Sequence, residues 1–242
     1  MADDNAVEAP LPVRRADLPT RFASAAVMLL LAGAALALGG RVLDAFIFLV
    51  ALIGFAETVR LVLLATPSLP LRLAGIAGGA AYFGVAALMM AGAGTFLLVL
   101  VLGIAVFTDT GAYFTGRTVG GPKIAPSISP SKTWAGLAGG MVASAAWVFI
   151  WLWAIDERFG GWPRFEIGLN MSFRNTAGGI ALGAALAVVA QAGDFLESWL
   201  KRRAGVKDSS RLIPGHGGVF DRIDGLVPVA IVAGLIAAQM AP

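Results

Sequence analysis

The sequence predicts an all-α integral membrane protein with about seven transmembrane helices. Hydrophobic residues make up 58% of the 242-residue chain and charged residues only 14%, with a mean hydropathy of +0.81. Soluble domains carry about 25% charged residues, so a soluble chain this apolar could not cover its own surface. Apolar stretches long enough, or nearly so, to cross a bilayer as helices recur along the sequence. The basic residues also fall mainly on one side of the resulting topology.

The chain begins with a polar tail, residues 1–20, and residues 21–242 are expected to form a single transmembrane catalytic domain. The first apolar stretch could instead be a signal peptide, because Ala35-Leu36-Ala37 resembles a cleavage site. The long acidic tail and the direct continuation into a second apolar stretch favour a retained first helix. The expected spans are residues 22–38, 43–64, 71–90, 94–110, 133–155, 176–200 and 225–240.

Glycine and alanine are abundant in these spans, as in residues 77–81 and at Gly136, Gly139 and Gly140. Lipid supplies no hydrophobic force between helices, which pack closely through small residues instead. We therefore interpret these glycines as packing positions rather than as a phosphate-binding loop. Such faces permit a homodimer without requiring one.

The distribution of basic residues predicts the orientation. If the N-terminus is cytoplasmic, all 18 Lys and Arg residues lie on the cytoplasmic side except Arg41, Arg158, Arg164 and Arg174. Cytoplasmic loops carry the excess of Lys and Arg in membrane proteins. We thus expect the N-terminus inside, the C-terminus outside, and two cytoplasmic loops at about 111–132 and 201–224. The compact chain suggests a bacterial inner (plasma) membrane.

Residue types exclude several kinds of site. The chain has no cysteine and a single histidine, His216, so it has no disulfide, thiolate metal site or site built from several imidazoles. Carboxylates inside a bilayer cost roughly 2.5–3.5 kcal/mol on insertion scales and tend to be paired, solvated or functional. Glu57 has Arg60 one helical turn later, and we expect the two to form an ion pair. Asp109 could contact a ligand or cap a helix end.

The end of the sixth span carries polar residues at 194, 197, 198 and 201. These offsets place Asp194, Glu197 and Lys201 on one helical face together with Ser198. Such a helix end presents two carboxylates, a hydroxyl and an ammonium to one cavity. The alternative is a polar seam between packed helices.

The loop after this span is rich in basic residues. They alone could be ordinary cytoplasmic charges or a surface for anionic lipid headgroups. That explanation leaves out the glycines 215, 217 and 218 around His216, and the pair Asp221 and Asp224. Carboxylates are usual ligands for magnesium held between protein and phosphates. Together with many cations they favour phosphoryl or nucleotidyl transfer.

Two segments resemble a known family. The first reads Ser198-x-Leu200-Lys201-Arg202, then Lys207-Asp208-x-Ser210, then Ile213-Pro214-x-His216-Gly217-Gly218-Val219-x-Asp221-Arg222-Ile223-Asp224. The second reads Asp109-Thr110-Gly111-Ala112-Tyr113-Phe114-x-Gly116-Arg117, then Pro126-x-Ile128-Ser129-Pro130-x-Lys132-Thr133-x-x-Gly136. Both resemble the phosphatidate cytidylyltransferases, or CDP-diacylglycerol synthases. Ala135 departs from the pattern, since many members have an acidic or amide residue there.

The resemblance implies that CTP and phosphatidate, taken from the cytoplasmic leaflet, react to CDP-diacylglycerol and pyrophosphate in phospholipid biosynthesis, with Mg²⁺ required and a second cation left open. It implies metal ligands at Asp194 and Asp221, with Asp224 in support. The expected catalytic residues are these three and Lys207. The expected substrate-binding residues are Arg117, Ser129, Lys132, Lys201, Arg202, Arg211, His216, Gly217, Gly218 and Arg222. His216 could act as a base or order the loop.

Other functions are weighed against this one. A CTP-dependent lipid kinase or another lipid nucleotidyltransferase would keep the nucleotide chemistry, but the unbroken match over residues 198–224 disfavours both. A CDP-alcohol phosphotransferase would need a longer aspartate-rich pattern. A membrane transporter would spread polar residues along several spans, whereas here they cluster at one face. No nucleic acid is expected as a partner.

Overall fold

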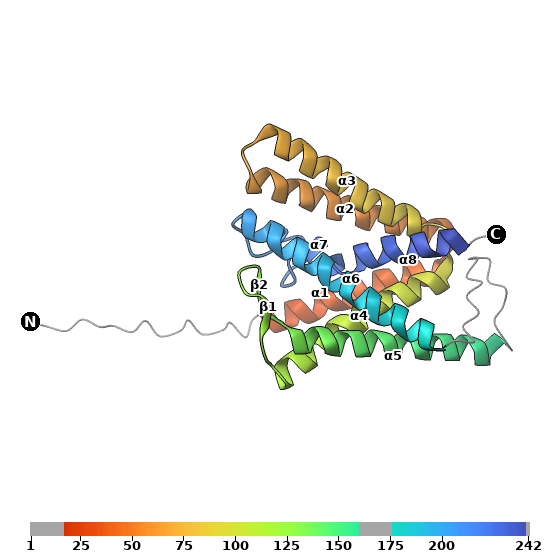
Figure 1. Cartoon of the computed structure of the whole chain (residues 1–242). Helices are drawn as coiled ribbons and strands as arrows, with labels where there is room; N and C mark the ends of the chain where they lie inside the picture. The colour runs from red at the N-terminus through yellow and green to blue at the C-terminus, as the bar shows by residue number, and fades with distance from the viewer. Residues whose placement is uncertain (1–16, 160–175, 241–242) are drawn as a thin grey trace, which may run out of the picture.

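The computed structural model describes residues 17–159 and 176–240, which form a bundle of long helices (Figure 1). Apart from one short hairpin, the described elements are helices. In chain order they are α1 Asp17–Leu38, α2 Gly40–Ala65, α3 Leu69–Met90, α4 Gly94–Thr118, β1 Lys123–Ala125, β2 Ser129–Thr133, α5 Trp134–Phe159, α6 Thr176–Arg203, α7 Phe220–Ile223 and α8 Leu226–Met240.

Six of the helices in the described ranges, α1 to α6, are long and apolar enough to cross a membrane. The seventh expected span corresponds to α8, a shorter apolar helix of 15 residues. The prediction of an all-α polytopic membrane protein is therefore confirmed. Most of the polar tail, and the outer segment with Arg164 and Arg174, lie outside the described residues. The cytoplasmic orientation stays a prediction.

The two expected loops lie at the same end of the bundle, together with the start of α1 (Figure 1). The first is shorter than expected, because α4 continues to Thr118. Strands β1 and β2 then pair antiparallel, with Lys123 opposite Thr133 and Ala125 opposite Ser129. In the second, α6 continues to Arg203 and the short α7 forms just before α8. Polar residues from both segments are thus brought to one face.

Glycines allow α4 and α5 to pack closely along much of their length. A Cβ at Gly139 would lie 2.1 Å from Thr115 Oγ1 and 2.8 Å from the carbonyl oxygen of Gly111. A Cβ at Gly140 would lie 2.9 Å from the carbonyl oxygen of Thr108. These distances are too short for any side chain, so the two backbones approach through small residues as expected for helices in lipid.

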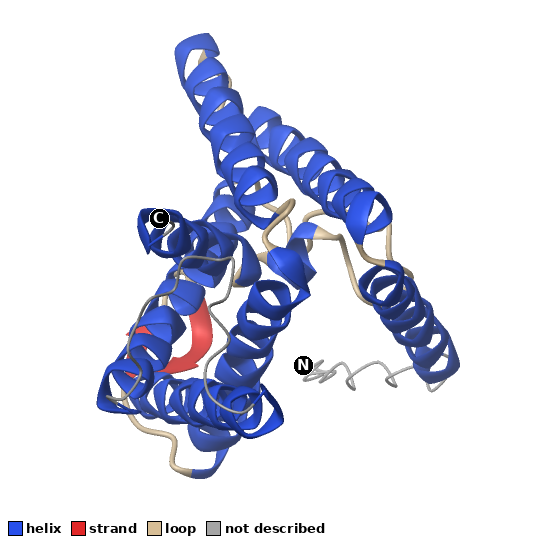
Figure 2. Cartoon of the chain, turned by 90° about the vertical axis from the view of Figure 1, so that its right-hand side faces the viewer, coloured by secondary structure: helices blue, strands red, loops and turns tan. Residues whose placement is uncertain are grey.

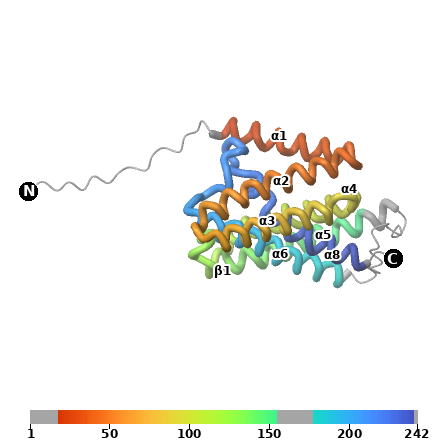
Figure 3. The backbone as a smooth tube through the Cα atoms, turned by 90° about the horizontal axis from the view of Figure 1, so that it is seen from above, coloured from red at the N-terminus to blue at the C-terminus, as the bar shows by residue number. Residues whose placement is uncertain are grey.

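A second core joins α2, α3, α7 and α8. Phe83 of α3 is 2% exposed and meets Phe220 of α7 edge-on, with ring centroids 5.2 Å apart. On its other side a Cβ at Gly54 of α2 would lie 2.6 Å from Phe83 Cε1. By contrast, α1 lies at the edge of the bundle and is mostly exposed (Figures 2 and 3). Its apolar side chains are therefore suited to contact with lipid.

The close packing of α4 on α5 predicts a contrast between two Gly→Ala variants. Gly139→Ala should lower the free energy of unfolding by about 1–3 kcal/mol, because the added methyl overlaps Gly111 and Thr115. Gly78→Ala, with no atom within 4 Å of the added Cβ in α3, should be neutral or stabilising by up to about 1 kcal/mol. Thermal unfolding of both variants in detergent measures this. Equal melting temperatures would contradict the packing.

Candidate active site

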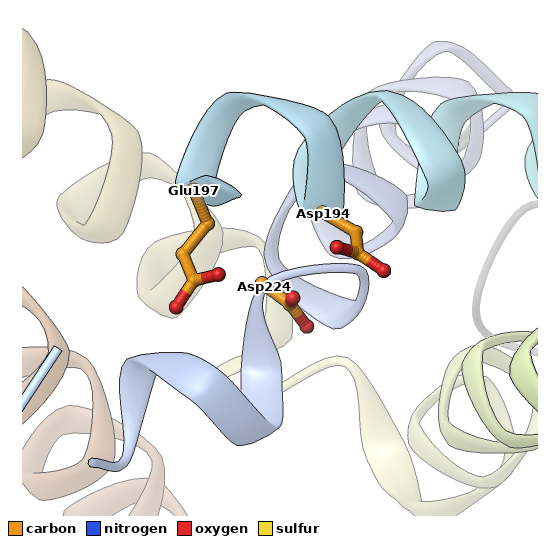
Figure 4. A group of neighbouring side chains, drawn as sticks. All are labelled: Asp194, Glu197 and Asp224. Carbon is orange, nitrogen blue, oxygen red and sulfur yellow. The ribbon is translucent and has the colours of Figure 1, made fainter. Parts of the chain in front are cut away.

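Three carboxylates from two segments meet at one end of the bundle. Asp194 and Glu197 extend from α6, and Asp224 lies between α7 and α8; Figure 4 shows the three side chains together. One oxygen of each lies within 4.8 Å of the others. The close approach of Asp224 to α6 depends on Gly193, where a Cβ would lie 2.3 Å from the carbonyl oxygen of Asp224. A larger residue at 193 would therefore push the two segments apart.

This carboxylate cluster is an unfavourable arrangement without cations. Burial and the nearby charge of Asp194 together raise the pKa of Asp224 to about 7, although a hydrogen bond from the Gly225 amide lowers it. Glu197 is 1% exposed, and its Oε1 has no hydrogen-bond partner among the described residues. Asp194 is more open, with its side chain 23% exposed. The cluster thus has buried acceptor capacity that the chain itself does not satisfy.

Lys201, one turn further along α6, joins the cluster to the loop before α7. Its Nζ lies 2.5 Å from Glu197 Oε2 and 2.7 Å from Asp221 Oδ1. The other oxygen of Asp221 accepts hydrogen bonds from the amides of Ser209, at 2.9 Å, and Gly218, at 2.8 Å. Although burial opposes it, these bonds and those of the Glu197–Lys201 pair hold the pKa of Asp221 well below its usual range.

Of the three metal ligands predicted from the sequence, only two lie close together in the structure. Asp194 and Asp224 lie in the cluster as expected. Asp221 is turned to Lys201 and to the loop amides, and the third carboxylate of the cluster is Glu197. The spacing of Asp194 and Glu197 on one helical face was the signal that could have selected Glu197, but it does not say which loop aspartate faces them.

Lys132 reaches the cluster from the hairpin. Its Nζ donates to Asp194 Oδ2 and, over 3.0 Å, to Gln191 Oε1. Ser129, at the start of the same strand, is buried. Arg202 at the end of α6 donates to the carbonyl oxygen of Ile128, 3.3 Å away. The hairpin is thus joined to α6 through Lys132 and Arg202.

The glycine-rich loop around residues 215–218 contacts α1. Gly215 and Gly217 have φ values of +76° and +82°, which side-chain-bearing residues rarely adopt. They turn His216 toward α1, where its Nδ1 lies 2.8 Å from Ser24 Oγ. Arg222 donates to the His216 carbonyl oxygen at 2.9 Å. His216 therefore orders the loop against α1, and Lys207 and Arg211 project with exposed side chains.

Two cavities near the cluster differ in the polarity of the residues that line them. A polar cavity of about 560 Å³ is bounded by α4, the hairpin, α5 and α6. Its charged and amide residues are Asp109, Arg117, Lys123, Lys132, Gln191 and Asp194. An apolar cavity of about 130 Å³ is bounded mainly by α2, α3, α4 and α8, and includes Ile223 and Leu226 on either side of Asp224 and Gly225. Asp194 thus lines the polar cavity, and Asp224 lies in sequence between two residues that line the apolar cavity.

The expected ion pair of Glu57 with Arg60 is wrong. Within the described residues Glu57 instead accepts hydrogen bonds from the loop around residues 209–220, and Arg60 donates to the carbonyl oxygen of Ser209 at 2.5 Å. Local spacing suggested the pair, but the loop offers Glu57 several N–H and O–H donors that no helical neighbour can match.

Comparison with known proteins agrees with this geometry. The model of the cytidylyltransferase family matches residues 77–239, about two thirds of the chain. The chain belongs to the cytidylyltransferase family. The match includes the hairpin, the carboxylate cluster and the glycine-rich loop, and excludes α1, α2 and the start of α3. The resemblance seen in the two sequence segments is confirmed at the level of the family.

Curated relatives in this family are similar over part of their length. The chain is 42% identical to a phosphatidate cytidylyltransferase of Brucella suis over 144 residues, 60% of this chain and 47% of the relative. It is 43% identical to one of Haemophilus influenzae over 133 residues, 55% of this chain and 42% of the relative. For one of Staphylococcus haemolyticus the identity is 36%, over 55% of this chain and 45% of the relative. The chain spans about half the length of the curated relatives it matches.

Because Lys201 pairs with both Glu197 and Asp221, its substitution should have a large effect on stability. Lys201→Met keeps the aliphatic stem but leaves Glu197 and Asp221 without their common partner, and should cost about 3–5 kcal/mol of unfolding free energy. Lys207→Met, at an exposed side chain, should change it by less than about 0.5 kcal/mol. Thermal unfolding in detergent compares the two. A Lys201→Met melting temperature equal to that of Lys207→Met would contradict the buried bridge.

Proposed function

We propose that this chain transfers the cytidylyl group of CTP to phosphatidate, forming CDP-diacylglycerol and pyrophosphate. The observation that carries the proposal is the carboxylate cluster, in which Asp194 lines a polar cavity and Asp224 lies in sequence between two residues that line an apolar one. A reaction between a water-soluble nucleotide and a membrane lipid needs access to both kinds of space. The names of the curated relatives support the same reaction.

The polar cavity suits CTP. Arg117, Lys123 and Lys132 line it from α4 and the hairpin, and Arg and Lys are the residues that bind phosphate oxygens. Lys132 is closest to the cluster through Asp194, so it is placed to contact the reacting phosphates. Arg222 in α7 and Arg211 in the preceding loop are not among the residues that line this cavity.

The apolar cavity suits the acyl chains of phosphatidate. It is lined throughout by apolar side chains, and Ile223 and Leu226 carry this lining to the edge of the carboxylate cluster. A lipid with its chains there would have its phosphate near Asp224. Burial of each methylene contributes about 0.8 kcal/mol relative to water, so apolar walls favour the lipid over soluble phosphates.

The carboxylate cluster fits a magnesium ion. Mg²⁺ prefers oxygen ligands and is commonly held by one or two carboxylates together with substrate phosphates. Asp194, Glu197 and Asp224 supply these oxygens, and the unpartnered Oε1 of Glu197 is an acceptor that such an ion would satisfy. We propose Glu197 as a ligand in place of Asp221, which orients Lys201. A bound Mg²⁺ supplies neutralisation of phosphate charge.

The protein's contribution to the chemistry is position and charge. A phosphate oxygen of phosphatidate attacks the α-phosphorus of CTP, and the bond to the bridging oxygen of the departing pyrophosphate breaks. The attacking phosphate is already anionic near neutral pH, so it requires no base. Lys132 and Arg117, which line the polar cavity, hold the nucleotide. We place the site at the cytoplasmic face of the inner membrane, because the basic residues gather at this end.

The reaction is tested with purified protein, cytidine-labelled CTP, phosphatidate and Mg²⁺. Label should enter lipid only with Mg²⁺, and Glu197→Gln and Asp224→Asn should each reduce the rate at least about 100-fold, the order of effect of losing one group that stabilises transition-state charge. Asp221→Ala should lower the rate through Lys201 but leave the Mg²⁺ concentration for half-maximal rate nearly unchanged. No labelled lipid from folded protein would refute the proposal, and label from γ-phosphate in lipid would show a kinase instead.

The placement of the two substrates predicts separable effects on KM. Arg117→Ala should raise the KM for CTP about 10-fold or more, as a lost charged hydrogen bond is worth about 1.5–3 kcal/mol, with little change for phosphatidate. Ala51→Phe fills the apolar cavity and should raise the KM for phosphatidate alone. Its control is Leu52→Phe, at a side chain 62% exposed on the same helix. If Arg117→Ala raised the KM for phosphatidate and Ala51→Phe that for CTP, the assignment of the two substrates to the two cavities would be reversed.

A further inference from the structure

Glu57 of α2 is a buried carboxylate that binds the loop before α7. It is 6% exposed and accepts four hydrogen bonds from that loop. Oε1 accepts from Ser210 Oγ at 2.6 Å and from the Val219 amide at 3.0 Å. Oε2 accepts from Ser209 Oγ at 2.9 Å and from the Phe220 amide at 2.7 Å. Residues 209–210 in the middle of the loop and residues 219–220 at the start of α7 are therefore held by one side chain.

This arrangement is costly unless the hydrogen bonds are kept. A buried carboxylate loses its hydration and needs compensating donors, and bonds to a charged acceptor are stronger than neutral ones. Arg60, one turn along α2, adds a bond to the Ser209 carbonyl oxygen at 2.5 Å. A Cβ at Gly218 would lie 2.5 Å from Glu57 Oε2 and 2.1 Å from Ser209 Oγ. The glycine at 218 is thus required for the loop to close around Glu57.

From Glu57 a continuous set of polar contacts leads to the carboxylate cluster. Ser209 Oγ lies between Glu57 Oε2 and Asp221 Oδ2, at 2.9 and 2.8 Å, and its one proton serves either oxygen. Asp221 Oδ1 accepts from Lys201 Nζ at 2.7 Å, and Lys201 also pairs with Glu197. Each side chain in this series is therefore oriented by its contact with the following one. Displacement of the loop would release Asp221, and with it Lys201 from Glu197.

We propose that Glu57 is a positioning residue for the active site: through Ser209, Asp221 and Lys201 it fixes Glu197 and the segment carrying Asp224. Glu57 lies in α2, outside the residues 77–239 that match the family model. The effect on catalysis rests on the proposed cytidylyl transfer; the hold on the loop does not.

The test compares Glu57→Gln with Asp44→Asn. Either orientation of a glutamine amide directs its NH₂ group at a backbone amide, Val219 or Phe220, which cannot turn away. Asp44 lies on the same helix and accepts one bond from the Gly92 amide at 3.1 Å, which an asparagine oxygen can keep. Ser210→Ala, which removes a single donor to Glu57, is the milder variant if Glu57→Gln folds poorly.

Two readouts are measured on each protein: amide hydrogen exchange, and kcat and KM for both substrates. In Glu57→Gln, exchange over residues 209–221 should be at least 10-fold faster while α4 and α5 keep wild-type protection. The value of kcat should fall at least 10-fold with both KM values within 3-fold. Ser210→Ala should shift both readouts in the same direction by less, and Asp44→Asn should match the wild type.

Other results would overturn the proposal. Wild-type loop exchange and kcat in Glu57→Gln would show that Glu57 does not position the loop. Exchange raised throughout the bundle, with Ser210→Ala unchanged in kcat, would show a purely structural residue. A wild-type protein without cytidylyl transfer would instead refute the proposed function, and the exchange measurement would still decide whether Glu57 holds the loop.

Discussion

Lys201 forms ion pairs with Glu197 in its own helix and with Asp221 in α7, and the geometry of the site depends on this bridge. Charges taken out of water must find partners of opposite sign and hydrogen-bond donors, or the fold loses several kcal/mol for each. In an otherwise apolar bundle the carboxylates cannot be scattered. They gather where Lys201, Lys132 and loop amides meet them, at the end of the helices that also carries the two polar segments.

Close backbone packing makes that gathering possible. Gly193 lets Asp224 approach α6, and the glycines of α4 and α5 bring the hairpin with Lys132 over the same point. Lipid offers no hydrophobic force to press helices together, so contact between small residues has to set the distances. The same positions that stabilise the bundle thus determine how near the carboxylates lie to one another.

The two cavities near the cluster differ in their lining. Arg117 and Lys132 face a polar space, while Ile223 and Leu226 face an apolar one. In the proposed reaction a lipid phosphate and a nucleotide phosphate would meet at the cluster, beside α7. Glu57 of α2 binds the loop before α7 and the start of α7, so an amino-terminal helix contacts the segment next to the cluster.

Hydropathy and helical spacing predict the membrane class and most helix bounds, because both are local properties of the sequence. Spacing also places Asp194, Glu197 and Lys201 on one helical face, and two segments of fixed residues indicate the family. The folded chain is needed to see that Glu197 rather than Asp221 joins Asp194 and Asp224, and that Glu57 binds the loop rather than Arg60. Those choices depend on which donors lie near each carboxylate in space, and residues 57 and 209–220 meet only when the chain is folded.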